Sequence, residues 1–496
     1  MKILSKINLS PFLRDVILTG ITSVLVVISL IFVTRFLAMG LGPEGFGAFA
    51  LARRLVSFIL PFSTLSLGIA LTRYLAISED NTTRSGYFIA AAVIIVCTSM
   101  LILLFGYAGH DRLTILIFHD LRYIDLFHAT LVMIVGYGVY EIIYAYYRGI
   151  QRIDIANLWQ IVVMAIFPLL IAYVYGRQNG EVSVIFLMGL AAFLCLVPSA
   201  VLVKKAPLKS PASVLNPMGD LMRYGVPRAP GGLALYGMLV IGPLIAPYIG
   251  TLKDAGYLVI GQSVLRVTET FVVAFGLVAL PKVTQLFSEG KIEFLKERIN
   301  DIIAMILHVG IFASVQLFLL SHEIVVVWLG EEYLPAVPVV KVLIVASCPY
   351  LGYVMLRSII DAVEVRAVNT LNLLIALVIA TILSVSLGYS GLGIVGIALG
   401  IMIGFFFLGV SSAGFLVKKY SITLVNMHLV PVLLVNIMFT LGTLLLKLYV
   451  ARYFHSFGML AVMLVIELVF FALYLWFLDR RRIQWIQEFK IRLFHT

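Results

Sequence analysis

Long apolar stretches, separated by short polar connections, follow one another along the whole chain. Each stretch is about 18 residues or longer, and a helix of that length can cross the roughly 30 Å hydrocarbon core of a bilayer. The pattern predicts about fourteen transmembrane helices. We place them at residues 15–39, 46–76, 87–108, 126–148, 157–176, 184–203, 226–249, 255–280, 299–320, 338–362, 368–388, 393–417, 427–450 and 458–478.

The composition excludes a water-soluble fold. Of the 496 residues, 62% are hydrophobic and only 12% are charged, which is more apolar side chain than a soluble domain can bury. Backbone polar groups in lipid must be satisfied within the protein, and repeated apolar stretches of this length do so as helices. We therefore predict an all-α polytopic membrane protein.

The basic residues predict its orientation. Most of the 36 Lys and Arg fall in connections on the same side as the N-terminus, and such connections usually face the cytoplasm. Both termini are therefore expected in the cytoplasm, with the protein in the inner (cytoplasmic) membrane. The net charge of +11 is then explained by anionic membrane lipids, and no nucleic-acid partner is expected.

Two segments of the chain repeat one another weakly. Residues 41–51 and 250–260 share a polar turn, a glycine and an aromatic-aliphatic helix, and residues 155–158 echo residues 367–370 at nearly the same offset. A repeat of six spans keeps its orientation, so the two copies would be related by an axis along the membrane normal around a central cavity. The predicted organisation is an N-terminal six-helix lobe, a cytoplasmic linker, a C-terminal six-helix lobe, two extra helices and a basic cytoplasmic tail, at 1–203, 204–225, 226–417, 418–478 and 479–496.

The chain resembles the polysaccharide transporters of the multidrug/oligosaccharidyl-lipid/polysaccharide flippase superfamily, which include the Wzx-type O-antigen flippases. The resemblance is carried by the turn and helix at 42–55 and by the motifs YRGIQR, LMRYGVP and WLGEEYL, at 147–152, 221–227 and 328–334. It implies fourteen helices in two lobes and a substrate in which a polyprenyl pyrophosphate carries an oligosaccharide. The expected role is flipping this lipid to the outer leaflet for lipopolysaccharide or another cell-surface polysaccharide, in contact with polymerase machinery.

Polar residues inside the span at 255–280 form a candidate binding site. Gln262, Arg266 and Glu269 are spaced as one helical stripe, and Arg266 lies about ten residues beyond Gly256, roughly 15 Å along the helix. An arginine at that depth cannot reach the interface, so it is expected to face a cavity and to bind the pyrophosphate through its planar fork. The competing interpretation is an Arg266–Glu269 pair that neutralises itself.

Further charged residues extend the candidate set. Arg53, Arg54 and Ser57 lie in the second span and are predicted to line the substrate cavity, although the two arginines are shallow enough to snorkel. Arg357 is a weaker substrate-binding candidate, because with Asp361 it could equally form a salt bridge at a helix end. A second list holds the candidates for binding a coupling ion, H⁺ or Na⁺: Glu269, Glu141 and Asp361.

Two other functions compete with the flippase. An ion-coupled drug or cation exporter of the same architecture would favour acidic cavity residues. A polytopic glycosyltransferase or polysaccharide polymerase would need a catalytic loop outside the membrane, and no connection exceeds about 25 residues. The sequence contains no glycine-rich phosphate loop, so we expect a secondary transporter rather than an enzyme, with no cofactor and no metal.

Overall fold

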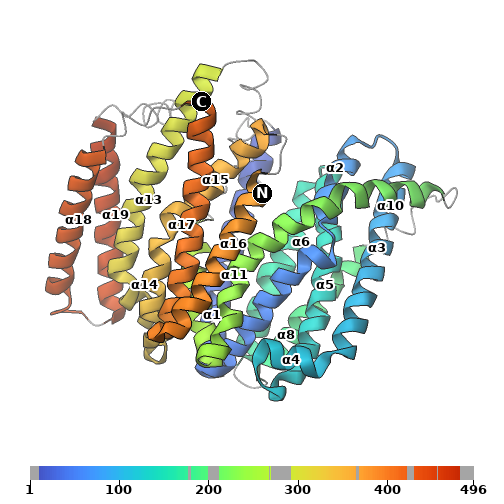
Figure 1. The fold of residues 1–496 in the computed structure, drawn as a ribbon, viewed down its shortest axis with the longest axis horizontal. Coiled ribbons are helices and arrows are strands. Elements are labelled where there is room, and N and C mark those ends of the chain that lie inside the picture. The colour runs from blue at the N-terminus through green and yellow to red at the C-terminus, as the bar shows by residue number, and fades with distance from the viewer. Residues whose placement is uncertain are drawn as a thin grey trace. The chain divides into compact units, whose positions relative to one another are not determined.

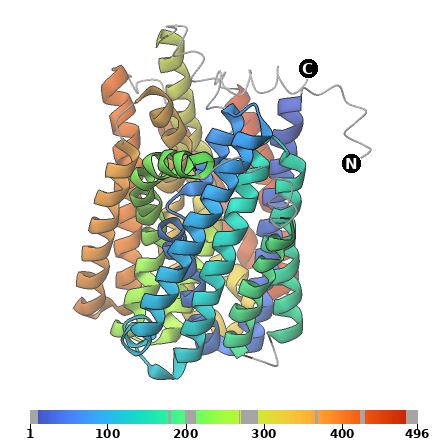
Figure 2. The same cartoon turned by 90° about the vertical axis from the view of Figure 1, so that its right-hand side faces the viewer.

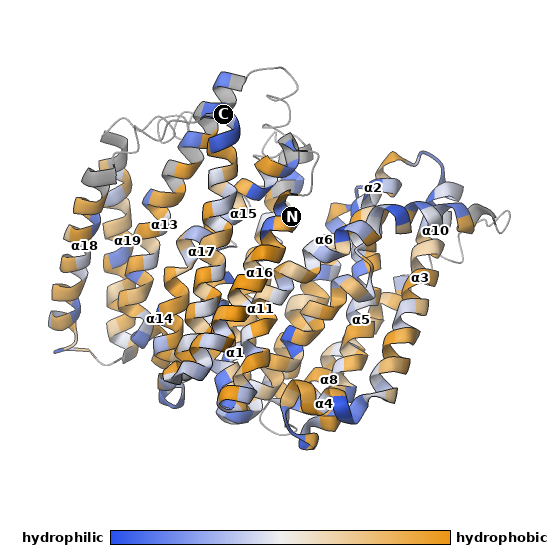
Figure 3. Ribbon diagram, viewed as in Figure 1, coloured by the Kyte–Doolittle hydropathy of each residue, from blue (hydrophilic) through white to orange (hydrophobic). Residues whose placement is uncertain are grey.

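The protein is helical throughout the part that the structure describes. In this computed structural model, no strand occurs among the described residues, and short turns join the helices (Figure 1). Hydrophobic residues occupy most of the length of the helices, and hydrophilic residues gather near helix ends such as those of α2, α4 and α10 (Figure 3). This confirms the predicted all-α class. The described residues are 11–176, 180–198, 212–266, 269, 292–364, 368–421, 429–454 and 456–480.

The helices are long enough to make this a multi-pass membrane protein. Ten helices in the described ranges are long and apolar enough to cross a bilayer, or eleven if Glu331–Val345 and Ser347–Asp361, which meet at 44°, form one bent span. The predicted count of fourteen is not confirmed. Ile17–Ser63 and Val368–Tyr420 each extend across the boundary between two predicted spans, and half of the predicted span at 255–280 lies outside the described residues.

Glycines mark the two places where predicted spans are joined. Gly42, inside the helix at Ile17–Ser63, has φ 67° and ψ 177°, and Gly391, inside the helix at Val368–Tyr420, has φ 96°. A residue with a Cβ adopts these positive φ values only at a cost. The chain therefore turns at a glycine between two apolar helices without an intervening polar loop.

The chain divides into two compact units. Unit 1 comprises Met1–Val259 and Leu373–Ile397. Its elements include most of α16 (Val368–Leu387) and the π-helical turn η7 (Gly388–Leu392). The others are α1 (Pro11–Ser63), α2 (Leu67–Ile77), α3 (Asn81–Ala108), α4 (His110–Phe118), η2 (Leu121–Tyr123), α5 (Ile124–Gly149), α6 (Ile153–Ile161), η3 (Val162–Ile166), α7 (Phe167–Tyr175), α8 (Gly180–Ala192), η4 (Phe193–Cys195), α10 (Ala212–Gly225), η5 (Val226–Arg228) and α11 (Ala229–Ile249).

Unit 2 comprises Ile260–Asn372 and Ala398–Thr496. A further helix, over residues 252–266, contains the boundary between the units. The elements of unit 2 are α13 (Ile292–Leu329), η6 (Glu331–Ala336), α14 (Val337–Val345), α15 (Ser347–Val363), most of α17 (Gly393–Tyr420), α18 (Leu429–Val450) and α19 (Ser456–Arg480). The predicted lobe boundaries at 203 and 226 stay a prediction.

Small residues allow the helices of unit 1 to pack closely. A Cβ added to Gly136 of α5 would lie 2.3 Å from the carbonyl oxygen of Gly189 on α8, and one added to Gly189 would lie 2.7 Å from Cα of Met133. Contacts this close require glycine, and they are the usual way in which helices associate in lipid. They fix α5, which carries Glu141, against its neighbour.

One helix of unit 1 lies across the others. Residues 212–225, at the end of the predicted linker, form α10, which packs on α2 and α3. Figure 1 shows α10 running across the end of α3, and Figure 2 shows the same helix nearly end-on. The remainder of the predicted linker, residues 204–211, lies outside the described residues.

Candidate functional site

The second predicted span is broken beside Glu141. Helix α1 ends at Ser63, and α2 begins at Leu67. The main-chain N–H of Ser66 bonds to the carbonyl of Pro61 over 3.1 Å, and that of Leu65 bonds to Phe62 over 3.2 Å. This is the hydrogen-bond pattern of a Schellman motif, which usually places glycine in the left-handed conformation.

Two non-glycine residues carry the left-handed turn here. Leu65 has φ 47° and Ser66 has φ 53°, values that cost an L-residue about 1–2 kcal/mol each. Strain of this kind within a membrane helix is found where function requires an interrupted helix. The break therefore belongs to the candidate site.

The side chain of Glu141, a residue of α5, contacts the first turn of α2, which is the second half-helix. A Cβ added to Gly68 of α2 would meet Oε1 of Glu141 at 2.7 Å, so the carboxylate rests directly on the Gly68 backbone. The N-terminal end of a helix carries partial positive charge, which favours an anionic group there. The side chain of Glu141 forms no ion pair or hydrogen bond with another described residue. A carboxylate that no described cation neutralises can take up a proton or a small cation.

A buried hydroxyl lies one helical turn from Glu141. Ser63 is fully buried, and its Oγ has no hydrogen-bond partner among the described residues. Its Oγ lies 3.8 Å from the position of a Cβ added to Gly138, three residues before Glu141 on α5. The helix break thus gathers a carboxylate, a hydroxyl and the ends of two half-helices in one small region.

The predicted cavity residues of the second span lie on α1. Arg54 is buried with 8% of its surface exposed, whereas Arg53 is half-buried. The Arg53 guanidinium interacts electrostatically with the hydroxyl of Tyr137, one turn before Glu141 on α5. Ser57 donates its hydroxyl to the carbonyl of Arg53 over 3.3 Å. The structure thus brings Arg53 to the polar face of α5, and the role of these residues in substrate binding stays a prediction.

The stripe at 262–269 has members in different environments. Gln262 is fully buried, and neither Nε2 nor Oε1 of its side chain has a hydrogen-bond partner among the described residues. Arg266 is exposed. Glu269 accepts a hydrogen bond of 2.9 Å from the hydroxyl of Tyr350 on α15. Tyr350 was not a candidate residue, and no local sequence pattern pairs it with Glu269, 81 residues away.

Arg357 and Asp361 do not form the ion pair that their spacing allows. Asp361 Oδ1 instead accepts a hydrogen bond of 2.7 Å from Nδ2 of Asn369, which also donates to the carbonyl of Arg357 over 2.9 Å. The Arg357 guanidinium lies 5.9 Å from the ring centroid of Tyr353. Asn369 was not a candidate, although the sequence echo with Asn157 could have indicated it. Both asparagines are buried and donate side-chain hydrogen bonds.

Other charges in the spans of unit 2 serve packing. Lys447 of α18 pairs with Glu323 of α13, with Nζ 2.9 Å from Oε2. Thr443 Oγ1 lies 2.8 Å from Oε1 of Glu467 on α19 and 3.0 Å from Oε1 of Gln316, so its single hydroxyl proton can bond to either oxygen. These contacts join α13, α18 and α19 inside lipid, where a polar group needs a partner.

One end of unit 1 holds Glu44, which follows the turn at Gly42. The hydroxyl of Tyr123 donates to Glu44 Oε1 over 3.2 Å, and Nη2 of Arg122 lies 3.7 Å from the same oxygen. Hydrogen bonds from the main-chain N–H and then the guanidinium of Arg122 lower the pKa of Asp120. These exposed contacts hold the turn against η2.

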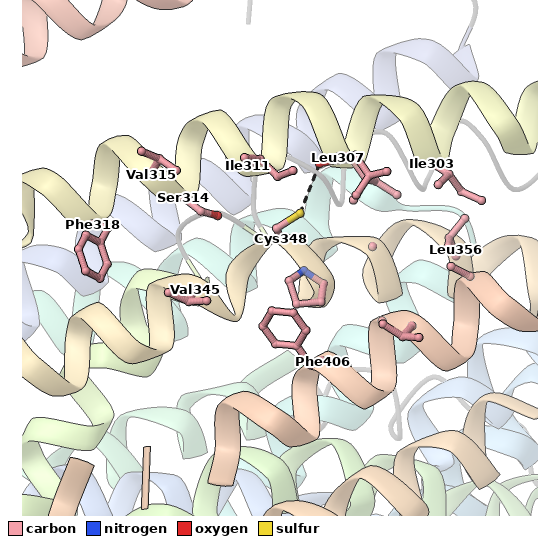
Figure 4. Close-up of a pocket in the computed structure, with 16 residues that line it drawn as sticks. Ile303, Leu307, Ile311, Ser314, Val315, Phe318, Val345, Cys348, Leu356 and Phe406 are labelled. Atoms are coloured by element: carbon pink, nitrogen blue, oxygen red, sulfur yellow. Dashed lines mark hydrogen bonds between the residues drawn. The ribbon is translucent and has the colours of Figure 1, made fainter. Parts of the chain in front are cut away.

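Unit 2 contains an apolar cavity of about 500 Å³ between α13, α14, α15 and α17. Figure 4 shows Ile311, Phe318 and Phe406 around it. Its polar side chain, Ser314, donates to the carbonyl of Gly310 and contacts Ser347, so the cavity offers no unsatisfied group to a charged ligand.

The described residues contain no group of three or more His, Cys, Asp or Glu arranged to hold a metal ion. The expected absence of a metal and of a cofactor stays a prediction.

Solved structures of transporters share this fold. The lipid II flippase MurJ in an inward closed conformation matches with a TM-score of 0.72 at 14% identity, covering 95% of this chain and 100% of MurJ. An inward-facing multidrug resistance MATE family transporter of the MOP superfamily matches at 0.65 and 13%, covering 81% and 98%. A MOP superfamily transporter from Pyrococcus furiosus matches at 0.58 and 14%, covering 83% and 96%.

The chain thus has the helical fold of these solved membrane transporters. The sequence model for polysaccharide biosynthesis proteins matches residues 12–287, more than half of the chain. The protein belongs to this family, which confirms the resemblance drawn from its motifs. No curated protein matches the sequence significantly.

Proposed function

We propose that this protein is a flippase that moves a polyprenyl-pyrophosphate-linked oligosaccharide from the cytoplasmic to the outer leaflet in cell-surface polysaccharide biosynthesis. The observation that carries the proposal is the family match over residues 12–287 on a MOP-type fold. Polysaccharide assembly on a lipid carrier requires a step that takes the charged headgroup across the membrane. A bare pyrophosphate and sugar would cross hydrocarbon only at a cost of many kcal/mol.

The proposed mechanism is alternating access with guanidinium groups replacing the water around the pyrophosphate. Arg266 is the principal ligand, with Gln262 beside it, and Arg53, Arg54, Ser57 and Arg357 complete the candidate set. Bidentate, charge-assisted hydrogen bonds from arginine suit phosphate oxygens. The buried side chain of Gln262, unsatisfied among the described residues, supports a polar ligand on this face.

The isoprenoid tail needs no polar contact. The cavity between α13, α15 and α17 is lined almost entirely by apolar side chains, and it supports the proposal that unit 2 holds a hydrocarbon chain while the headgroup binds elsewhere. The membrane lipid around the protein is its other partner. Contact with polysaccharide polymerase machinery is part of the proposal.

Ion coupling is proposed to pass through acidic residues in the spans. Glu141 is the leading candidate, because its carboxylate lies at a break in a membrane helix and an unpartnered buried hydroxyl lies one helical turn away. Glu269 and Asp361 are bonded to Tyr350 and Asn369, so a bound H⁺ or Na⁺ would compete with existing contacts there.

A drug or cation exporter is the alternative, favoured by the MATE fold match. The Pyrococcus furiosus transporter is described as having a binding pocket of reverse polarity that suggests a different function, so one fold serves pockets of opposite charge. Function must therefore be argued from the residues. The arginines at 53, 54 and 266 favour an anionic substrate here.

Deletion of the gene in its host tests the proposal. Loss of the flippase should remove the surface polysaccharide while its lipid-linked precursor accumulates, and expression of the intact chain should reverse both effects. A strain that makes no lipid-linked precursor would point to a glycosyltransferase. Exported but unpolymerised units would point to a polymerase, and an unchanged surface with increased drug sensitivity would point to the exporter.

A further inference from the structure

The motif at 221–227 takes part in a cationic cluster at one end of unit 1. Tyr224, near the end of α10, has two guanidinium groups at its ring: Cζ of Arg228 lies 3.6 Å from the ring centroid and Cζ of Arg73, on α2, lies 4.6 Å from it. Nη1 of Arg73 donates to the hydroxyl of Tyr224 over 2.9 Å, and Nη1 of Arg228 donates to the main-chain carbonyl of Tyr224 over 2.8 Å. One tyrosine therefore holds two cations in defined positions.

No described residue neutralises these two charges. Neither Arg73 nor Arg228 forms an ion pair in the part of the chain that the structure describes. Asp220, the acidic residue on α10, is hydrogen-bonded by Tyr87 over 2.8 Å. Both arginines are exposed, and each guanidinium has five N–H donors. Most of those donors remain available to an anion.

The cluster lies beside a helix suited to the membrane surface. Leu215 and Met222 of α10 and Val226 just beyond it are 64%, 39% and 40% exposed, and their spacing places them close to one helical face. Leu221, on another face, is fully buried. A helix that presents apolar side chains outward while it lies across the ends of spans (Figures 1 and 2) is expected at the boundary of headgroups and acyl chains.

We propose that Arg73 and Arg228, held by Tyr224, bind the phosphoryl headgroup of a lipid in the leaflet that α10 faces. Phosphate oxygens accept the paired N–H groups of guanidinium, and an anion between two like charges removes their repulsion. A polyprenyl pyrophosphate and an anionic phospholipid share this chemistry. If the former is the ligand, which rests on the proposed function, the site collects the substrate before translocation.

Lipid binding to single variants tests this site. The intact protein in phosphatidylcholine nanodiscs is titrated with three probes: a polyprenyl pyrophosphate, phosphatidylglycerol and inorganic pyrophosphate. Arg73→Ala and Arg228→Ala should each weaken binding of at least one lipid probe about tenfold. Arg223→Ala, which removes an exposed charge of the same motif without a contact to the Tyr224 ring, is the matched control and should change binding less than about threefold. Lysine at either position should recover part of the loss.

The pattern of losses identifies the source of the headgroup. Weakened binding of the pyrophosphate lipid alone supports the site with substrate as its ligand, loss of phosphatidylglycerol alone supports it with a resident phospholipid, and loss of both supports a general headgroup site. Binding of both lipids that matches the Arg223→Ala control would overturn the proposal, as would inorganic pyrophosphate binding as tightly as the lipids.

Tyr224→Phe is a further control that guards against misfolding of the alanine variants. It keeps the ring and removes one hydroxyl, so it should weaken binding less than either alanine variant. Because nothing is translocated in this assay, failure of the proposed transport would leave the result intact.

Discussion

Gly47 and Gly256 pack directly against each other in unit 1. A Cβ added to Gly256 would lie 3.1 Å from Cα of Gly47, and one added to Gly47 would lie 2.1 Å from the carbonyl oxygen of Leu252. The weak sequence repeat makes these two glycines equivalent positions. The predicted internal repeat itself stays a prediction, and the contact shows only that these two glycines allow their helices to approach closely.

Gly47→Ala should therefore destabilise the protein strongly. The new methyl group would overlap a backbone carbonyl that cannot rotate away, and overpacking of this kind costs about 1–3 kcal/mol or more. Gly20→Ala is the matched control, because no atom lies within 4 Å of its added Cβ. Thermal unfolding of the purified variants measures the difference. Equal unfolding temperatures for the two variants would contradict the close contact.

Gly68→Ala should separate stability from transport. The added methyl would meet the carboxylate end of Glu141 at 2.7 Å, and a flexible side chain can move aside at a stability cost of about 1 kcal/mol or less. If Glu141 binds the coupling ion, this displacement should lower ion-driven transport at least about tenfold, and Glu141→Gln should have a similar effect.

Gly138→Ala is the control for that experiment. Its nearest contacts, 3.8 Å and beyond, are ordinary van der Waals distances, so transport should stay close to wild type. Transport is measured in vesicles with and without an imposed H⁺ or Na⁺ gradient. Full gradient dependence in Glu141→Gln would exclude Glu141 as the coupling group.

The Lys447–Glu323 pair predicts a rescue between α13 and α18. Glu323 is buried, with His322 Nδ1 also 3.5 Å from its carboxylate, so Lys447→Ala should cost about 2 kcal/mol by leaving a buried charge poorly compensated. Adding Glu323→Gln should recover most of the loss. The unfolding temperatures of the single and double variants form the test, and a simple sum of two losses would show that the residues are not coupled.

The basic-residue pattern predicts which ends of the helices face outward. In a variant lacking Cys97, Cys195 and Cys348, single cysteines at the exposed positions of Glu44 and Glu331 should react with an impermeant reagent in intact cells. A cysteine at Lys418, also exposed, should react only after permeabilisation, as should one at Lys209, which lies outside the described residues. The reverse labelling would invert the topology.

The spans were predictable because the length of an apolar run is read directly from the chain. The break at Leu65 and Ser66 was not, because neither residue type marks a left-handed turn and only the nearby Pro61 hints at an interruption. The apolar stretch at 46–76 was therefore predicted as one helix, although the structure divides it between the end of α1 and α2. The turn at Gly42, by contrast, falls between the predicted spans at 15–39 and 46–76, and the count differs there because Ile17–Ser63 is counted as one helix across the turn.

The partners of buried charges were less predictable than the charges. Arg357 and Asp361 have ion-pair spacing, yet the Asp361 carboxylate bonds to Asn369 on the next helix. Lys447 pairs with Glu323, which is 124 residues away, and no local pattern identifies such a partner. The sequence identifies charged residues that are costly to place in lipid, but only the fold shows which residue forms an ion pair or a hydrogen bond with each of them.

The double variant of Arg266 and Glu269 separates substrate binding from mutual neutralisation. If Arg266 holds the pyrophosphate, Arg266→Ala and the Arg266→Ala/Glu269→Ala double variant should both be inactive, because neither keeps the guanidinium. Arg266→Lys should recover part of the activity, because it keeps the charge and loses the planar fork. Full activity in the double variant would mean that Arg266 only compensates Glu269.

The most direct test of the flippase is the rate at which reconstituted vesicles move a polyprenyl-pyrophosphate-linked oligosaccharide between leaflets. The sugar is read by an impermeant probe, and efflux of a cationic drug is followed in parallel vesicles. We expect the wild-type protein to move the lipid and not the drug, with Arg266→Ala at least about tenfold slower because charge-assisted hydrogen bonds to the headgroup are lost. Drug efflux without lipid movement, or lipid movement no faster than in protein-free vesicles, would contradict the account.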